Sequence, residues 1–213
     1  TPLYSSAASD VYKRQMKRII SIVFYLLLIS SLQADFKIMV GMNRSRYRVL
    51  PENEGTKWST KPGFSAGIGL EKDFSPHTIL EFDILYSGKG SRVESKDEPT
   101  LKYDLKTLSL PVMLKIKFFE ETSPYAVGGI ELSYVLSHKI KLEKQAEIDL
   151  KENTRSFDYG FVVGVGFELK IEDHLFLFIE TRYHQGKANL MRYPGVEESM
   201  FTRSILAVLG MKS

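Results

Sequence analysis

Apolar and polar side chains alternate along most of the chain after its first 34 residues. In the stretch LSLPVMLKIKFF, residues 108–119, every even position is apolar, whereas the odd positions include Ser109, Lys115 and Lys117. A period of two is the pattern of a β-strand with one apolar face. We find no convincing 3.6-residue period of an amphipathic helix in this region. The region is therefore predicted to be all-β.

Eight strand-like segments follow one another in this region. They cover residues 36–49, 63–72, 78–91, 101–119, 125–142, 157–171, 175–190 and 201–211. Three connections are short and rich in turn-forming residues: DFSP, EETSP and EDH. The other four are long and polar, and they alternate strictly with the short ones. This alternation predicts an eight-stranded antiparallel up-and-down transmembrane β-barrel, with short periplasmic turns, long outer loops and both termini periplasmic.

The first 34 residues follow a different pattern. The segment MKRIISIVFYLLLISSLQADF combines two basic residues, Lys17 and Arg18, with an apolar run over 19–29 and a small residue, Ala34, before Asp35. This is the layout of a secretory signal peptide, with cleavage predicted between Ala34 and Asp35. The run is shorter than the roughly 20 apolar residues that a membrane-spanning helix needs. A buried N-terminal helix or a retained anchor is the alternative.

The leader divides the chain into three predicted segments. We predict an upstream extension that does not belong to the natural protein over residues 1–15, a signal peptide over 16–34 and the barrel over 35–213. Four of the 29 basic and one of the 26 acidic residues lie in the leader, which leaves 25 of each in the barrel. The net charge of +3 is therefore no indication of nucleic-acid binding. The absence of cysteine excludes disulfides, thiolate metal sites and a cysteine nucleophile.

The alternating strands allow two orientations of their apolar faces. In the segment 78–91, for example, Leu80 and Phe82 alternate with Glu81 and Asp83. A soluble barrel would bury the apolar face, whereas a membrane barrel would turn it to lipid. The signal peptide, the alternation of loop lengths and the many Gly and Ser on the polar face favour the membrane barrel. Small residues suit the narrow interior of eight strands.

Charged residues on the polar face are then predicted to lie in the lumen, where an unpaired charge is costly. Similar heights on their strands bring Glu81 and Asp83 close to Lys115 and Lys117. The remaining predicted members are Glu131, Glu168, Lys170, Glu180, Arg182 and Arg203. Our hypothesis is a salt-bridge network that plugs the periplasmic half of the lumen. Alternatively, some of these charges lie at the level of headgroups or water.

Two local features carry further expectations. Pro111 lacks an N–H for the strand ladder, which predicts a bulge or kink at this position. The long loop over 138–155 keeps its alternation, which predicts a hairpin that extends past the membrane. A mobile charged loop is the alternative for this segment.

Four stretches resemble a known family, the eight-stranded outer-membrane β-barrels of Bacteroidota called porin-family or PorT-like proteins. The stretches are LYSGKGSR (85–92), TLSLPVMLK (107–115), PYAVGGIELSYVLS (124–137) and RYHQGKANL (182–190). Thr107 and Ser109 depart from the Tyr and Glu often found in the second motif. The final LGMKS also departs from the terminal aromatic residue that the insertion machinery often reads. The order and spacing of the motifs nevertheless match.

The resemblance implies an outer-membrane location more directly than an activity. Because eight strands with a filled lumen leave no aqueous channel, we expect negligible conductance despite the name porin family. We expect a non-enzymatic protein that acts through its outer loops or in envelope assembly or secretion. The expected partners are outer-membrane lipid, the barrel insertion machinery and a protein of the envelope or its surroundings. We expect no nucleic acid, no cofactor and a monomer.

Two other function classes remain open. An outer-membrane enzyme acting on lipid would need a nucleophile beside a base, and only His184 with Ser87 and a carboxylate offers this combination. A soluble lipocalin-like carrier would need an apolar lumen and a Gly-x-Trp near the first strand. The only tryptophan, Trp58, is predicted to lie in a loop without that spacing. No spacing of His, Asp and Glu indicates a metal site.

Overall fold

The computed structural model describes residues 34–51, 56–95, 101–142, 147–191 and 199–213. The predicted extension and almost all of the predicted signal peptide lie outside these residues. The chain divides into the units Thr1–Ala34 and Asp35–Ser213. In the described part of the chain, no helix is both long enough and apolar enough to cross a membrane.

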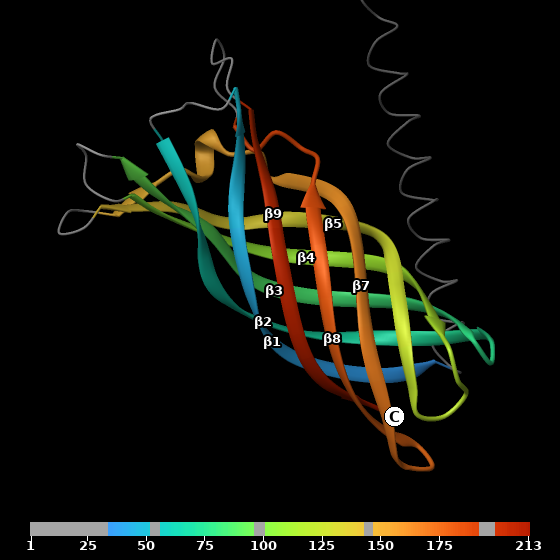
Figure 1. Ribbon diagram of the computed structural model, residues 1–213. Helices are drawn as coiled ribbons and strands as arrows, with labels where there is room; N and C mark the ends of the chain where they lie inside the picture. The colour runs from blue at the N-terminus through green and yellow to red at the C-terminus, as the bar shows by residue number, and fades with distance from the viewer. Residues whose placement is uncertain (1–33, 52–55, 96–100, 143–146, 192–198) are drawn as a thin grey trace, which may run out of the picture. The chain divides into compact units, whose positions relative to one another are not determined.

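Eight long antiparallel strands form a closed barrel in the second unit (Figure 1). They are β1 (Asp35–Leu50), β2 (Thr56–Ser75), β3 (Thr78–Ser95), β4 (Leu101–Lys117), β5 (Ser123–Leu142), β7 (Phe157–Glu172), β8 (Leu175–Gly186) and β9 (Ser199–Lys212). The chain order is kept around the sheet, and pairing of β1 with β9 and of β4 with β5 completes the ring. The prediction of an eight-stranded up-and-down barrel is confirmed.

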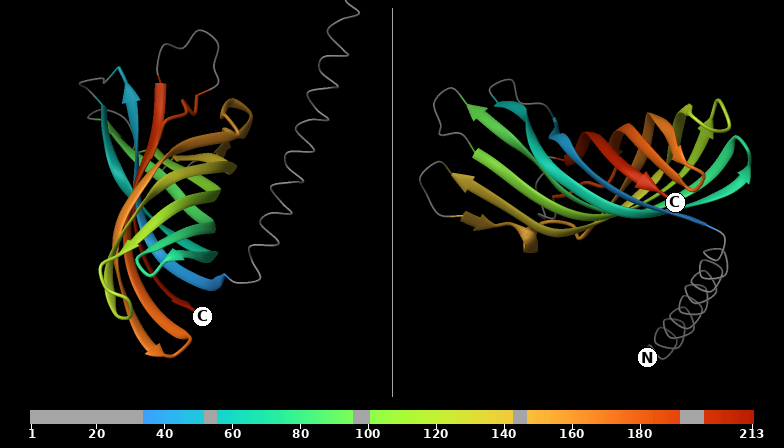
Figure 2. Two further views of the ribbon diagram at one scale, coloured as in Figure 1. Left: turned by 90° about the vertical axis from the view of Figure 1, so that its right-hand side faces the viewer. Right: turned by 90° about the horizontal axis from the view of Figure 1, so that it is seen from below.

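The short connections all lie at one end of the barrel, together with the C-terminus (Figure 2). The amides of Phe118 and Phe119 donate to the hydroxyl of Ser123, which holds the turn between β4 and β5. At the same end, the amide of Phe36 donates to the carbonyl of Ser213 at 2.9 Å. By the rule for outer-membrane barrels, this is the periplasmic end. We refer to the opposite end as the outer end.

The outside of the barrel is apolar along most of its height. Phe161, Val163 and Val165 of β7, for example, are more than half exposed, while their neighbour Val162 is 1 % exposed. A soluble protein rarely exposes so large a continuous apolar surface. Many inward positions instead carry Gly, Ser and charged residues. The apolar face therefore belongs to lipid and the polar face to the lumen.

The structure changes several local expectations. Trp58 lies in β2 and not in a loop, because β2 extends seven residues beyond the predicted start at Gly63. At its other end, β8 stops at Gly186, four residues before the predicted end. The predicted hairpin is present, since β6 (Glu147–Asp149) pairs with β5, but a 3-10 turn (Lys151–Asn153) separates β6 from β7.

Of the two irregularities predicted at Pro111, a bulge or a kink, the bulge is wrong. The pairing of β4 with β3 keeps one register on both sides of Pro111, but two successive pairs are missing from the ladder between Val112 and Ser109. Towards β5 the ladder passes Pro111 without interruption. The missing N–H is therefore accommodated by a local gap in one ladder. The register shift of β4 lies instead at Lys106 and Thr107.

The lipid-facing surface predicts a solvent requirement that a gel can measure. Residues 35–213, refolded in detergent, are expected to give a β circular-dichroism spectrum and to migrate faster unboiled than boiled. Without detergent the same chain is expected to aggregate, because its apolar surface has no solvent. A monodisperse β protein in plain buffer would contradict the outward orientation of the apolar face.

Candidate functional site

Acidic and basic side chains gather in the periplasmic half of the lumen. The residues of this lumenal charge cluster are Lys37, Lys115, Lys117, Arg182 and Lys212 with Glu71, Glu81, Asp83, Glu168 and Glu180. All ten are at most 6 % exposed. The five positive and five negative charges balance, so the cluster buries no net charge when every group is ionised.

One half of the lumenal charge cluster is organised around two carboxylates. The ammonium of Lys115 lies 3.0 Å from Glu71 and 2.6 Å from Glu168. Lys212 bridges the same two carboxylates at 2.9 and 3.2 Å. Lys117 adds a third cation to Glu168 at 3.0 Å and also donates to the carbonyl of Glu120. The carboxylates thus connect β2, β4, β7 and β9.

The other half is organised around the guanidinium of Arg182. Its two terminal nitrogens donate to Asp83 at 2.6 Å and to Glu81 at 2.7 Å, and its Nε donates to Glu180. Lys37 contacts Glu81 and Asp83 and approaches Glu71 at 3.8 Å, which joins the two halves. A guanidinium with three carboxylate partners is strongly oriented, because its donors have a rigid planar geometry.

Of the ten residues predicted for the lumenal network, seven lie in this cluster: Glu81, Asp83, Lys115, Lys117, Glu168, Glu180 and Arg182. Their pairing differs from the expected one. Glu81 and Asp83 meet Arg182 and Lys37 rather than Lys115 and Lys117. The prediction had paired charges that lie at similar heights on adjacent strands. Which charges meet across the lumen is not determined by that height alone.

Three predicted members lie elsewhere. Lys170 is at the periplasmic rim, where it contacts Glu121 and Asp173, because it is only two residues from the end of β7. Arg203 lies on the outside of β9, where it donates to Gln185 at 2.6 Å; its neighbours Thr202 and Ser204 point inward. Glu131 is buried but belongs to a separate group higher in the lumen.

Sequence reasoning missed Lys37, Glu71 and Lys212. Lys37 alternates with exposed Phe36 and Ile38 on β1, so the period of two already marks it as inward. The same reading applies to Lys212, which follows exposed Met211 near the end of β9. The signal was present at these positions, but they lie close to strand ends.

The middle of the lumen is lined by small and polar side chains. Hydroxyls of neighbouring strands meet at Ser65 and Ser87 and at Ser109 and Ser133, 2.9 and 2.8 Å apart. In the same region, Glu131 accepts from Lys89 at 3.2 Å and from Ser133 at 2.9 Å. His184 lies beside this pair, 3.4 Å from the Glu131 carboxylate.

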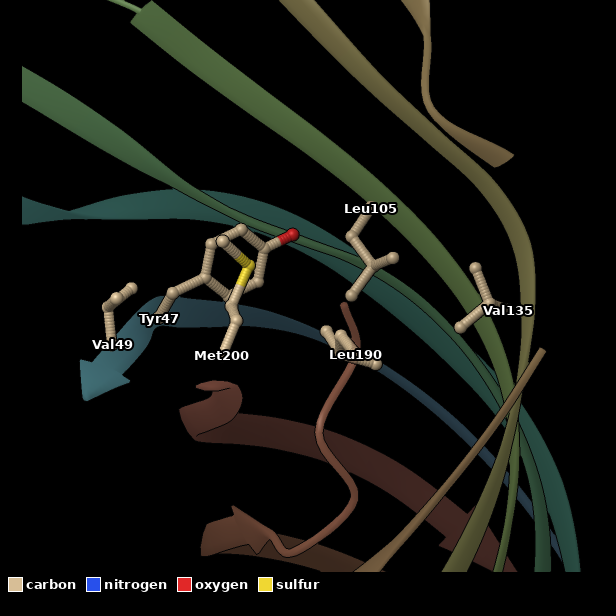
Figure 3. Close-up of a cluster of buried hydrophobic side chains, with 6 residues drawn as sticks. All are labelled: Tyr47, Val49, Leu105, Val135, Leu190 and Met200. Carbon is tan, nitrogen blue, oxygen red and sulfur yellow. The ribbon is translucent and has the colours of Figure 1, made fainter. Parts of the chain in front are cut away.

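An aromatic and aliphatic cluster occupies the outer part of the lumen (Figure 3). Its buried members are Tyr47, Val49, Leu105, Val135, Leu190 and Met200, and Trp58 and Tyr103 pack against them. The rings of Trp58 and Tyr103 each lie within 6 Å of the Tyr47 ring. The Tyr47 hydroxyl is 3.1 Å from His138, whose other ring nitrogen is 2.7 Å from the hydroxyl of Thr154.

The expected elements of an enzyme are not assembled in the described residues. The hydroxyl of Ser87 pairs with Ser65, and neither ring nitrogen of His184 has a hydrogen-bond partner there. A nucleophile would need a base within hydrogen-bond distance. Within the same residues, no group of three or more His, Asp or Glu side chains could hold a metal ion.

At the outer end, the hairpin of β5 and β6 carries an exposed ion pair between Lys139 and Glu147 at 2.7 Å. The hydrogen bond from Lys139 lowers the pKa of the Glu147 carboxyl. Both groups face solvent, so the pair adds little stability.

The chain is similar to several solved structures. The outer membrane protein OprG of Pseudomonas aeruginosa superposes with a TM-score of 0.52 at 15 % identity, over 84 % of this chain and 96 % of OprG. Neisserial surface protein A gives 0.49 at 13 %, over 83 % and 95 %, and Ail of Yersinia pestis, crystallised with a heparin analogue, gives 0.44 at 14 %, over 84 % and 99 %. At these identities the likeness to OprG concerns the fold alone.

The sequence comparison assigns the family. No curated protein sequence matches the chain. The family described as outer membrane protein beta-barrel domain matches residues 29–191, which is most of the chain. Together with the closed barrel, this match places the protein in the bacterial outer membrane. The chain belongs to the outer membrane protein β-barrel domain family.

Proposed function

We propose that this protein is a small, non-enzymatic, PorT-like barrel whose lumen is closed and which acts through its outer surface, in interactions or in envelope assembly and secretion. The observation that supports this proposal most directly is the lumenal charge cluster, in which five cations and five carboxylates are buried together in the periplasmic half. The aromatic cluster adds a second obstruction at the outer end. Two obstructions in series support a lumen without a continuous path for ions.

The finer family assignment rests on the sequence motifs. The stretches over 85–92, 107–115, 124–137 and 182–190 support a PorT-like member from Bacteroidota. The hairpin of β5 and β6 extends the wall at the outer end and offers a surface to a partner. The closed barrel supports a monomer, because pairing of β1 with β9 leaves neither strand open to pair with another copy.

Conductance in a planar bilayer tests the closed lumen. The refolded barrel, inserted at known density and verified by its heat-modifiable band, is expected to produce no current steps in molar KCl. A sixteen-stranded porin inserted in the same way is the positive control, because its wide lumen holds an aqueous channel. Reproducible steps from the wild-type barrel would overturn the proposal of a closed lumen.

A further inference from the structure

Three arginines form a row on the outside of β1, directly above the lipid-facing residues of that strand. Arg44, Arg46 and Arg48 are exposed, while Asn43, Ser45 and Tyr47 between them are at most 3 % exposed. The row therefore faces away from the lumen, and it lies nearer the outer end than Phe36, Ile38 and Val40 of the same strand. Residues two apart on a strand are separated by roughly 6.5 Å, so the row spans roughly 13 Å.

A fourth guanidinium widens this row on the neighbouring strand. Arg46 of β1 is the register partner of Arg203 of β9. Arg203 donates from its Nε to Gln185, and its terminal nitrogens form no ion pair within the described residues. Nor do Arg44, Arg46 and Arg48 form an ion pair with any described carboxylate. We call these four residues the arginine patch.

An apolar groove lies below the arginine patch on the same face of the barrel. It has a volume of about 630 Å³, and its lining includes Ile38 and Val40 of β1, Ile68 of β2, Ile84 of β3 and Leu209 of β9. Along the outward face of β1, starting from the periplasmic end, the groove residues thus come first, Met42 follows, and the arginines come last. Val40 and Arg44 are four residues apart, which corresponds to roughly 13 Å along the strand.

We propose that the arginine patch and this groove form one binding site for a phosphorylated lipid of the outer leaflet. The groove would hold part of an acyl chain, and the guanidinium groups would bind phosphate on the headgroup. Unpaired positive charge at the boundary of an apolar band is complementary to this arrangement of chain and anion. Arginine is well suited to it, because its donors match two phosphate oxygens at once.

The apolar groove beside the arginine patch favours a lipid over a soluble anion. Free phosphate would gain only the exposed charge interactions, which salt screens strongly. A lipid adds van der Waals contact between its chain and the groove, which a free anion cannot make. The site thus requires both parts of the ligand, and each part can be removed separately in an experiment.

Native mass spectrometry of the refolded chain in detergent can measure this binding. The probes are lipid A, the same lipid after enzymatic removal of its phosphates, and inorganic phosphate. The test variant carries Arg44→Gln, Arg46→Gln and Arg48→Gln. The matched control carries Arg92→Gln, Lys106→Gln and Arg155→Gln, which remove three exposed cations of other segments at the same end. The heat-modifiable band verifies that each variant is folded.

Wild type and control variant are expected to bind lipid A at least roughly tenfold more tightly than dephosphorylated lipid A, and the test variant is expected to lose this preference. Excess inorganic phosphate is expected to leave most of the lipid bound. Equal binding of lipid A by test and control variants would overturn the site. The site would also be overturned if the wild type bound dephosphorylated lipid A as tightly as lipid A. Full displacement of lipid A by inorganic phosphate alone would overturn it as well.

Discussion

The Lys115→Glu variant is expected to unfold at a markedly lower urea concentration than the wild-type barrel. The Lys115 ammonium is 1 % exposed and lies between Glu71 and Glu168. Its replacement removes a shared cation and adds a third carboxylate to the same buried space. Breaking a buried ion pair by removing one partner costs about 3–5 kcal/mol, and the new repulsion adds to this. Urea titration in detergent, followed by circular dichroism and by loss of the heat-modifiable band, measures the change.

Two further variants make this result specific. Lys106→Glu is the same substitution on the same strand at an exposed position, and it is expected to change the unfolding free energy by less than about 1 kcal/mol. Lys115→Met removes the cation without adding a carboxylate, and Lys117 and Lys212 still neutralise Glu168. The urea midpoint of Lys115→Met is therefore expected to lie between those of Lys115→Glu and Lys106→Glu. An unchanged midpoint for Lys115→Glu would contradict a stabilising role of the lumenal charge cluster.

The Gly129→Ala variant is expected to be destabilised or to fail to fold, although it adds a single methyl group. Gly129 points into the lumen between buried Val127 and Glu131. A Cβ at this position would meet the backbone carbonyl of Val112 and lie 2.7 Å from the Cα of Met113. Backbone atoms of a paired strand cannot move aside, and overpacking of this kind typically costs about 1–3 kcal/mol. The urea midpoint of the refolded variant measures the loss.

The neighbouring glycine provides a matched control. Gly128 faces outward on the same strand, and a Cβ there would meet nothing within 4 Å. Gly128→Ala is expected to be neutral or to stabilise by up to about 1 kcal/mol, because alanine reduces the freedom of the unfolded chain. The sign of the effect should thus reverse between adjacent residues. Similar midpoints for the two variants would show that the narrow lumen does not account for glycine at position 129.

Much of the architecture could be predicted from alternation alone. A side-chain period of two is a local property, so each strand of eight or more residues carries its own evidence of type and orientation. Alternation on β4 identified Lys115 and Lys117 as inward, and both are buried. The alternation of short and long connections then indicated the number of strands and the closed sheet. These features depend on neighbouring residues in the chain, which the sequence records directly.

The orientation of β9 shows where this approach failed. Its inward residues Leu206 and Val208 are as apolar as its outward residues Ile205 and Leu209. With apolar residues on both faces, the period of two is weak, and the prediction that Arg203 lies in the lumen was wrong. The register with β1 determines the side, and it turns Arg203 outward beside Arg46.

The sequence by itself determined the strands, their number and the side to which most charges point. Only the tertiary structure decided which charges meet, because contacts across a lumen depend on closure and register summed over all eight strands. Arg182 and Asp83 are 99 residues apart, and no local pattern relates them. The same dependence brings Lys212, near the end of the chain, to Glu71. Burial requires that each charge be paired, while the geometry of the closed barrel selects its partner.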